Sequence, residues 1–176
     1  MANTESQPSQ LAAIIAETRR IEEDSTYSAK GHFEASKSWN GWHYWIGVPT
    51  ALAAALAGVS AVSNEPVAAA VLSFAVAVTA ALSTFLKPSD RAAQHLAAGN
   101  AFKALQNDAR IFREVDCRAP ITTEQLSARL NELNVRRNEL NSQSPQIPRR
   151  AFKKARKGIE AGEASYAADA RRQKRR

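Results

Sequence analysis

One stretch of the sequence limits the fold more than any other, because residues 42–86 contain no Lys or Arg and only one acidic residue, Glu65. The stretch divides at Ser63-Asn64-Glu65-Pro66, a cluster of residues that favour turns. An α-helix of about 20 residues is roughly as long as the hydrocarbon core of a bilayer is thick. The sequence therefore predicts a transmembrane helical hairpin, with spans at about 42–63 and 67–86.

A soluble protein with two fully buried helices is the alternative. The chain has 176 residues, which leaves little else to surround two helices that are apolar on every face. The spans are rich in Ala rather than Leu, so their insertion into lipid is only moderately favourable, and the soluble alternative stays open. Residues 1–41 are polar and show no secretory signal, so we expect the first span to act as an uncleaved anchor.

Basic residues near the span ends predict the orientation of the hairpin. Lys30 and Lys37 precede the first span, Lys87 and Arg91 follow the second, and the turn between the spans has no Lys or Arg. The positive-inside rule then places both termini in the cytoplasm. Aromatic residues with a polar edge favour the headgroup layer. The residues of this kind at the start of the first span are Trp39, Trp42, Tyr44 and Trp45.

Small residues recur at four-residue spacing along both spans, a pattern that lets membrane helices approach closely. They serve either packing of the hairpin on itself or packing against other copies. These candidate packing residues are Ala53, Ala57, Ala61, Ala69, Ser73, Ala77 and Ala81. A lone hairpin cannot enclose a pore, so a pore would require a homo-oligomer. The candidate pore face is Ser73, Ala77, Ala80, Thr84 and Lys87.

The arms on either side of the hairpin have helical periodicity. Residues 10–39, with Ser9 as N-cap, and residues 90–116, with Ser89 as N-cap, each carry one apolar face, and we expect the two helices to extend the hairpin as a cytoplasmic stalk. A third helix is expected at about 124–141, with a capping box at Thr122 and Gln125 and a leucine seam that folds back on the stalk.

The fold class is therefore all-α, with four regions. Residues 1–41 form the N-terminal cytoplasmic helix, 42–86 the hairpin, 87–144 the cytoplasmic helices packed on the first, and 145–176 a basic tail. The tail holds 11 Lys and Arg against 3 acidic residues, and we expect it to contact anionic lipid or, less favourably, nucleic acid. Its basic residues are Arg149, Arg150, Lys153, Lys154, Arg156, Lys157, Arg171, Arg172, Lys174, Arg175 and Arg176.

The sequence lacks a phosphate-binding glycine loop, a nucleophile elbow and a metal-spaced set of Cys and His. We therefore expect no enzymatic activity, no cofactor and no metal. His32 and His95 lie on the two stalk helices, and an antiparallel arrangement could bring them face to face. Cys117 is the only cysteine, so the chain has no internal disulfide.

The residues that flank the spans carry a resemblance to a known family. They are Tyr27, Lys30, His32 and Phe33 before the first span, Trp45, Gly47 and Pro49 at its start, Thr84, Phe85, Leu86 and Pro88 at the end of the second, and His95, Gly99 and Arg110 after it. In this order they resemble the SLATT family of two-transmembrane effectors in bacterial conflict systems. The resemblance covers roughly residues 10–115 and leaves out the basic tail.

The resemblance implies an anti-phage effector that assembles in the inner membrane and causes growth arrest or cell death, as in abortive infection. It also implies a separately encoded partner, such as a sensor, a nucleotide synthase or a reverse transcriptase, or ligand binding by the cytoplasmic helices. The alternative is a membrane-anchored binding module, in which the hairpin only tethers a basic tail that contacts anionic lipid or nucleic acid.

Overall fold

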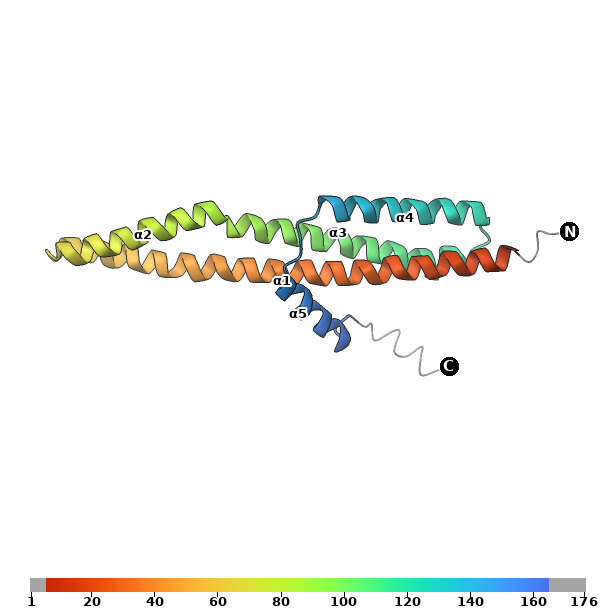
Figure 1. Ribbon diagram of the computed structural model, residues 1–176, viewed down its shortest axis with the longest axis horizontal. Helices are drawn as coiled ribbons and strands as arrows, with labels where there is room; N and C mark the ends of the chain where they lie inside the picture. The colour runs from red at the N-terminus through yellow and green to blue at the C-terminus, as the bar shows by residue number, and fades with distance from the viewer. Residues whose placement is uncertain (1–5, 165–176) are drawn as a thin grey trace. The chain divides into compact units, whose positions relative to one another are not determined.

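The computed structural model describes residues 6–164, and this part of the chain is helical with no strand. The prediction of an all-α chain is confirmed. The elements are α1 (Ser6–Val62), α2 (Pro66–Leu86), α3 (Pro88–Glu114), a short 3-10 helix (Asp116–Arg118), α4 (Thr123–Gln143) and α5 (Arg149–Glu160) (Figure 1). They form two compact units. The first contains residues 1–35 and 95–176, and the second contains residues 36–94.

The helix boundaries differ from two of our expectations. α1 is one continuous helix of 57 residues that runs from the expected N-terminal helix into the first span, and Ser9 lies within its first turn instead of capping it. Pro49 lies inside α1 and does not begin or end it. α3 begins at Pro88, which makes Ser89 its second residue and not its N-cap. Proline suits this first position because it lacks the N–H that would have no partner there.

The predicted turn between the apolar helices is present. Asn64 adopts a left-handed backbone conformation with φ 58°, and Pro66 begins α2. Lys87 ends α2 with φ 44°, and its backbone N–H donates to the carbonyl of Ser83 at 3.0 Å. Left-handed geometry costs a residue with a Cβ about 1 kcal/mol, so this single residue makes a tight junction between α2 and α3.

In the first unit, α1, α3 and α4 pack together around a shared core. α3 runs antiparallel to α1, and α4 folds back along both helices (Figure 1). The predicted capping box is confirmed, because the Thr122 side chain accepts from the Gln125 backbone N–H and the Gln125 side chain accepts from the Thr122 backbone N–H. The core consists of Ile14, Ile21, Leu105, Ala109, Phe112, Cys117 and Leu126, with Leu130, Leu133 and Leu140 packed against it.

The expected apolar face of α3 is buried, with one exception. The periodicity of residues 90–116 assigns Leu96, Phe102, Leu105 and Phe112 to this face. Phe102, Leu105 and Phe112 are each at most 3% exposed, whereas Leu96 is 48% exposed, so its assignment is wrong. The close approach of α1 and α3 depends on Gly99. A Cβ at this position would lie 2.7 Å from Cε1 of Phe33, so any larger residue would force the aromatic ring to move.

Candidate functional site

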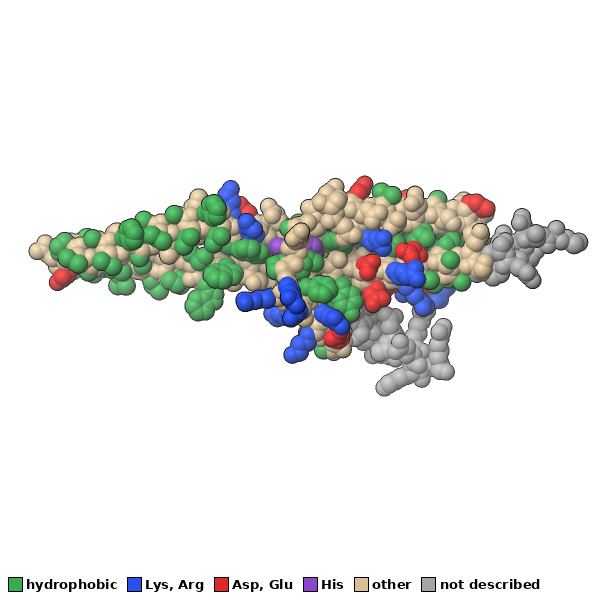
Figure 2. Space-filling view, in the orientation of Figure 1, with side chains coloured by type: hydrophobic (Ala, Val, Ile, Leu, Met, Phe, Trp, Pro, Cys, Tyr) green, Lys and Arg blue, Asp and Glu red, His purple; other side chains and the backbone are tan. Residues whose placement is uncertain are grey.

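The second unit contains the segments that could lie in a membrane. Two helices of the described chain, α1 and α2, contain stretches long and apolar enough to cross a bilayer, which is consistent with a two-span membrane protein. In the apolar 18-residue stretch of α1, 6% of the residues are buried, and in that of α2 none is buried. The soluble alternative required both helices to be covered by the rest of the chain, and the described residues do not cover them. Figure 2 shows hydrophobic side chains over the visible surface of this hairpin.

The two helices pack along one narrow seam. On α1 the half-buried or buried residues are Ile46, Thr50, Ala53, Ala57 and Ser60, and on α2 they are Ala69, Leu72, Val76, Thr79, Ser83 and Leu86. Successive seam residues are separated by alternating steps of three and four, the spacing by which two helices interlock side by side. The hydroxyls of Thr50 and Thr79 donate to backbone carbonyls of their own helices, at 2.7 and 2.9 Å, so they are satisfied without water.

The surface outside the seam has two different sides. An α-helix turns about 100° per residue, and the seam fixes which way each helix faces, so exposed positions that flank the seam can be assigned to one side of the hairpin or the other, whereas Phe74 and Ala81 lie opposite the seam and belong to neither side. One side carries small or short side chains: Gly47, Ala51, Ala54, Gly58 and Ala61 on α1, and Ala70, Ser73, Ala77, Ala80 and Thr84 on α2. The other carries bulky ones: Trp45, Val48, Leu52, Leu56 and Val59, and Val67, Val71, Val78, Leu82 and Phe85. We call these the small side and the bulky side.

The candidate packing residues divide between the seam and the surface. Ala53, Ala57 and Ala69 lie in the seam, whereas Ala61, Ser73, Ala77 and Ala81 are exposed. All five residues of the candidate pore face, Ser73, Ala77, Ala80, Thr84 and Lys87, are exposed, and the first four lie on the small side. The hydroxyl of Thr84 donates to the carbonyl of Ala80 at 3.0 Å.

The expected interface aromatics all lie on α1. Trp42, Tyr44 and Trp45 are 58%, 60% and 79% exposed, which is unusual for aromatic residues in water. Trp39 is half-buried, and the guanidinium carbon of Arg91 on α3 lies 5.0 Å from its ring centre, within range of a cation–π interaction. A groove of about 570 Å³ runs past Trp42, Trp45 and Ile46 and is bordered by Lys37. The groove has the composition expected at a headgroup boundary.

The first unit buries the predicted histidine pair. The Nδ1 atoms of His32 and His95 are 2.9 Å apart, and the two side chains are 2% and 4% exposed. One ring donates and the other accepts, so the pair holds a single proton between these two atoms. Burial, and secondarily repulsion from a charged His95, lowers the pKa of His32 from its ordinary 6.5 to about 4. The His32 ring also stacks on Phe102, with ring centres 5.6 Å apart.

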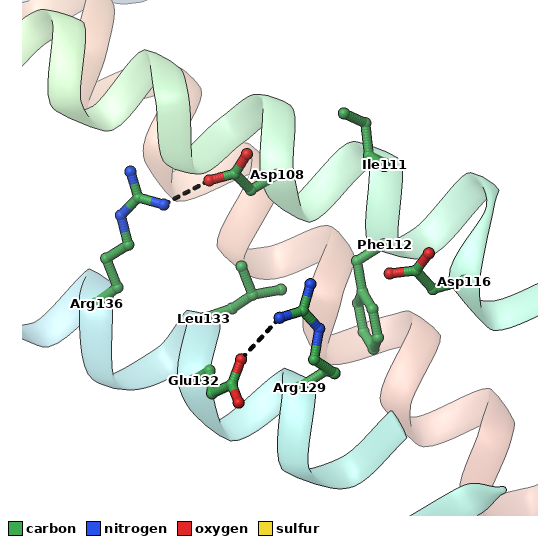
Figure 3. Close-up of a pocket in the computed structure, with 8 residues that line it drawn as sticks. All are labelled: Asp108, Ile111, Phe112, Asp116, Arg129, Glu132, Leu133 and Arg136. Carbon is green, nitrogen blue, oxygen red and sulfur yellow. Dashed lines mark hydrogen bonds and ion pairs between the residues drawn. The ribbon is translucent and has the colours of Figure 1, made fainter. Parts of the chain in front are cut away.

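A cavity of about 240 Å³ lies between α3 and α4 (Figure 3). Arg129 pairs with Glu132 at 3.0 Å, and Arg136 pairs with Asp108, so both guanidinium groups already have carboxylate partners. Phe112 and Leu133 supply an apolar wall, and Asp116 adds a further negative charge. The lining is therefore unsuited to an anionic ligand such as a nucleotide. In the part of the chain that the structure describes, no three His, Cys, Asp or Glu side chains are grouped as metal ligands.

The single cysteine lies in the core of the first unit. Cys117 is 7% exposed, and burial, together with the neighbouring Asp116 carboxylate, raises the pKa of its thiol. A thiol in these surroundings is a poor nucleophile.

The residues that carry the family resemblance fall into two environments. Tyr27, Phe33, Leu86 and Arg110 are half-buried, and His32, Pro88 and His95 are buried, so these seven contribute to packing. Gly47, Pro49, Thr84 and Phe85 are exposed on the hairpin. Comparison with protein-family models, with curated proteins and with solved structures finds no match to this chain.

The basic tail begins with a helix that the sequence left undecided. α5 carries Arg149, Arg150, Lys153, Lys154, Arg156 and Lys157, and all six side chains are exposed. Arg171, Arg172, Lys174, Arg175 and Arg176 lie outside the described residues. Sequence reasoning missed how α5 is held on α1. The relevant signal was the pair of small residues Ala151 and Ala155, four apart on an otherwise basic helix.

Proposed function

We propose that this protein is a two-span membrane effector of a bacterial conflict or anti-phage system. In this proposal the hairpin crosses the inner membrane with both termini in the cytoplasm, and copies assemble to permeabilise the membrane when a separately encoded partner senses infection. The observation that carries the proposal is the exposure of the apolar surface of the hairpin, since the described chain buries almost none of it. Apolar helices of this length are stable in lipid, where such exposure has no cost.

The two-sided surface of the hairpin supports assembly. Association of helices within a bilayer depends on close packing, which small residues permit, and bulky aliphatic residues are equally well accommodated by lipid tails. The small side therefore suits contact between copies, and the bulky side suits contact with lipid. Ser73 and Thr84 add hydroxyls to the small side, the only exposed polar groups between Val67 and Leu86. They would form the most polar part of an assembled interface or pore.

The flanking residues support the family and the orientation. The ordered set from Tyr27 to Arg110 resembles SLATT effectors, and the basic residues near the span ends favour cytoplasmic termini under the positive-inside rule. The first unit would then be the cytoplasmic stalk that receives the signal from the partner. The exposed aromatics Trp42, Tyr44 and Trp45 would lie in the cytoplasmic headgroup layer.

The test is forced assembly in bacterial cells. The full chain is fused at its C-terminus to a domain that dimerises on addition of a small molecule, and membrane potential is followed with a voltage-sensitive dye. We expect depolarisation and growth arrest soon after the molecule is added. Ala77→Leu, on the small side, should reduce the depolarisation at least about tenfold, because its bulk separates the helices.

The matched control is Ala75→Leu, the same substitution on the bulky side of α2, where Ala75 is also exposed. It should leave depolarisation within about twofold of the unsubstituted chain. Equal effects of the two substitutions, or no depolarisation on forced assembly, would contradict the proposal. Replacing the hairpin by an unrelated two-span anchor separates the two functional classes, since a binding module would keep its function after this exchange and a pore former would lose it.

A further inference from the structure

The helix α5 has two faces of opposite character. The six exposed Lys and Arg side chains lie within one arc of the helix, which also holds Glu160, and Ala151 and Ala155, which are 7% and 2% exposed, occupy the opposite face. Phe152 lies at the edge of the basic arc and is 42% exposed. Figure 2 shows the basic side chains gathered over this helix. A helix that exposes a cluster of Lys and Arg side chains is typical of surfaces that attract anionic lipid headgroups.

The position of α5 is fixed by contacts with α1. Ile147, which precedes the helix, packs so closely on Gly31 that a Cβ at residue 31 would lie 2.9 Å from its Cδ1. The Lys154 ammonium lies 2.8 Å from the Glu34 carboxylate, and the Lys30 ammonium lies 2.9 Å from Glu163. Hydrogen bonding to Glu34 raises the pKa of Lys154. These contacts hold α5 beside α1, with Ala151 and Ala155 buried and the side chains of the basic arc exposed, including Lys154, which reaches Glu34 at the edge of the arc.

Most of the charge on the arc is not neutralised by the described chain. Lys154 pairs with Glu34 and Arg156 pairs with Glu160, but Arg149, Arg150, Lys153 and Lys157 form no ion pair within residues 6–164. Four exposed basic residues without an ion pair on a twelve-residue helix therefore favour an external anionic partner.

We propose that α5 is a binding surface for anionic phospholipid headgroups. The inference deepens the proposed function and rests on it, because a chain anchored in a bilayer presents its soluble parts to the lipid surface continuously. Each basic residue near an anionic surface gains a favourable and salt-sensitive interaction, and Phe152 can enter the headgroup layer beside the arc. Nucleic acid is the less suitable partner, because the arc lacks the repeated aromatic residues on which bases stack.

The experiment measures amide hydrogen exchange of residues 149–160 in the full chain, reconstituted in nanodiscs of phosphatidylcholine alone or with one-third phosphatidylglycerol. We expect exchange of α5 to slow about tenfold in the anionic discs, and the difference to shrink below about twofold in 0.5 M salt. The charge variant is Arg149→Gln, Arg150→Gln, Lys153→Gln and Lys157→Gln. It leaves the contacts with α1 intact and should abolish the lipid difference while matching the unsubstituted chain in neutral discs.

The matched control removes four charges elsewhere, by Arg171→Gln, Arg172→Gln, Lys174→Gln and Arg175→Gln, and it should retain the lipid difference. Equal exchange in the two lipids, or loss of the difference only in the control, overturns the inference. So does stronger protection of α5 by single-stranded RNA with neutral discs at physiological salt, which would assign the arc to nucleic acid. If the chain fails to insert, the proposed function fails first, and flotation with the same two lipid mixtures then decides the role of α5 separately.

Discussion

Along α1, inward-facing residues recur at steps of three and four in the first unit and again in the second. In the first unit these positions include the buried polar residues Thr18, Ser25 and His32, whereas the exterior is charged. In the second unit the inward positions form only a seam, and the exterior is apolar: Leu52, Val71 and other large side chains are more than half exposed. The spacing of inward-facing residues is therefore the same along the whole of α1, whereas the exterior of the helix is charged in the first unit and apolar in the second.

The difference teaches that the spacing of inward-facing residues determines how the helices pair. The polarity of the exposed side chains determines whether water or lipid suits the outside of the pair. The first unit depends on the hydrophobic effect, because folding removes the side chains of Ile21 and Leu105 from water. In the membrane setting that we propose, the second unit would have no such driving force and would depend on close contacts along the seam. The two units should therefore respond differently to the same kinds of substitution.

The largest expected difference comes from removing a leucine from each unit. Leu105 is 0% exposed, so Leu105→Ala should lower the free energy of unfolding of the first unit by about 3 kcal/mol, through lost burial and a cavity. Leu82 is 49% exposed, and Leu82→Ala should cost less than about 1 kcal/mol. Amide exchange of 100–112 and 72–86 in the full chain in detergent measures both effects. Similar costs at the two sites would show that the second unit has a water-excluding core of its own.

The second prediction concerns pH and the histidine pair. Because the pKa of His32 is lowered to about 4 in the folded state, its neutral form is stabilised by folding. This contribution to the free energy of unfolding is fully present above pH 6.5 and is lost as the pH falls toward 4. At pH 4 the loss should amount to about 3 kcal/mol. Thermal unfolding of the full chain in detergent between pH 7 and 4 measures it. His32→Gln, which cannot take up a proton, should flatten this part of the profile.

The comparison of the two profiles removes the contribution of carboxylates, which titrate alike in both chains. A profile of His32→Gln that still falls as steeply as that of the unsubstituted chain would mean that the pair does not control acid stability.

Local and pairwise signals in the sequence predicted a large part of this structure. The turn at Asn64, the cap at Thr122 and the meeting of His32 with His95 follow from residues whose effects act within one turn or across one antiparallel pair. The spacing predicted a helix at 10–39 and a span from about residue 42, and the structure joins them into the single helix α1. Pro49 lies inside it, because a proline near the start of a long apolar run does not outweigh helix formation on both sides of it.

Two features of the candidate site could not be read from spacing alone. A strict four-residue series such as Ala69, Ser73, Ala77 and Ala81 rotates about 40° at each step, so it leaves the seam, which alternates steps of three and four. The packing of α5 on α1 depends on the contact between Gly31 and Ile147, two residues that are far apart in the sequence and share no pattern. Neither residue is distinctive until the fold brings them into contact.

The smallest expected effect concerns ion pairs within the first unit. Arg113 on α3 contacts Glu22 on α1 at 3.0 Å, and both side chains are less than one-fifth exposed. A double-mutant cycle with Arg113→Ala and Glu22→Ala should give a coupling of about 1 kcal/mol, because partial burial limits screening. Arg129 and Glu132 lie on one helix and are 64% and 65% exposed, so the corresponding cycle should give about 0.3 kcal/mol.

The two coupling energies should also differ in their dependence on salt. Raising the ionic strength should reduce the coupling of Arg129 with Glu132 to near zero and preserve most of the coupling of Arg113 with Glu22, since partly buried charges are screened less than exposed ones. Urea unfolding of the full chain in detergent measures each cycle. Equal coupling at both sites would mean that charge contributes to the first unit only through its surface, and that its apolar core alone distinguishes it from the hairpin.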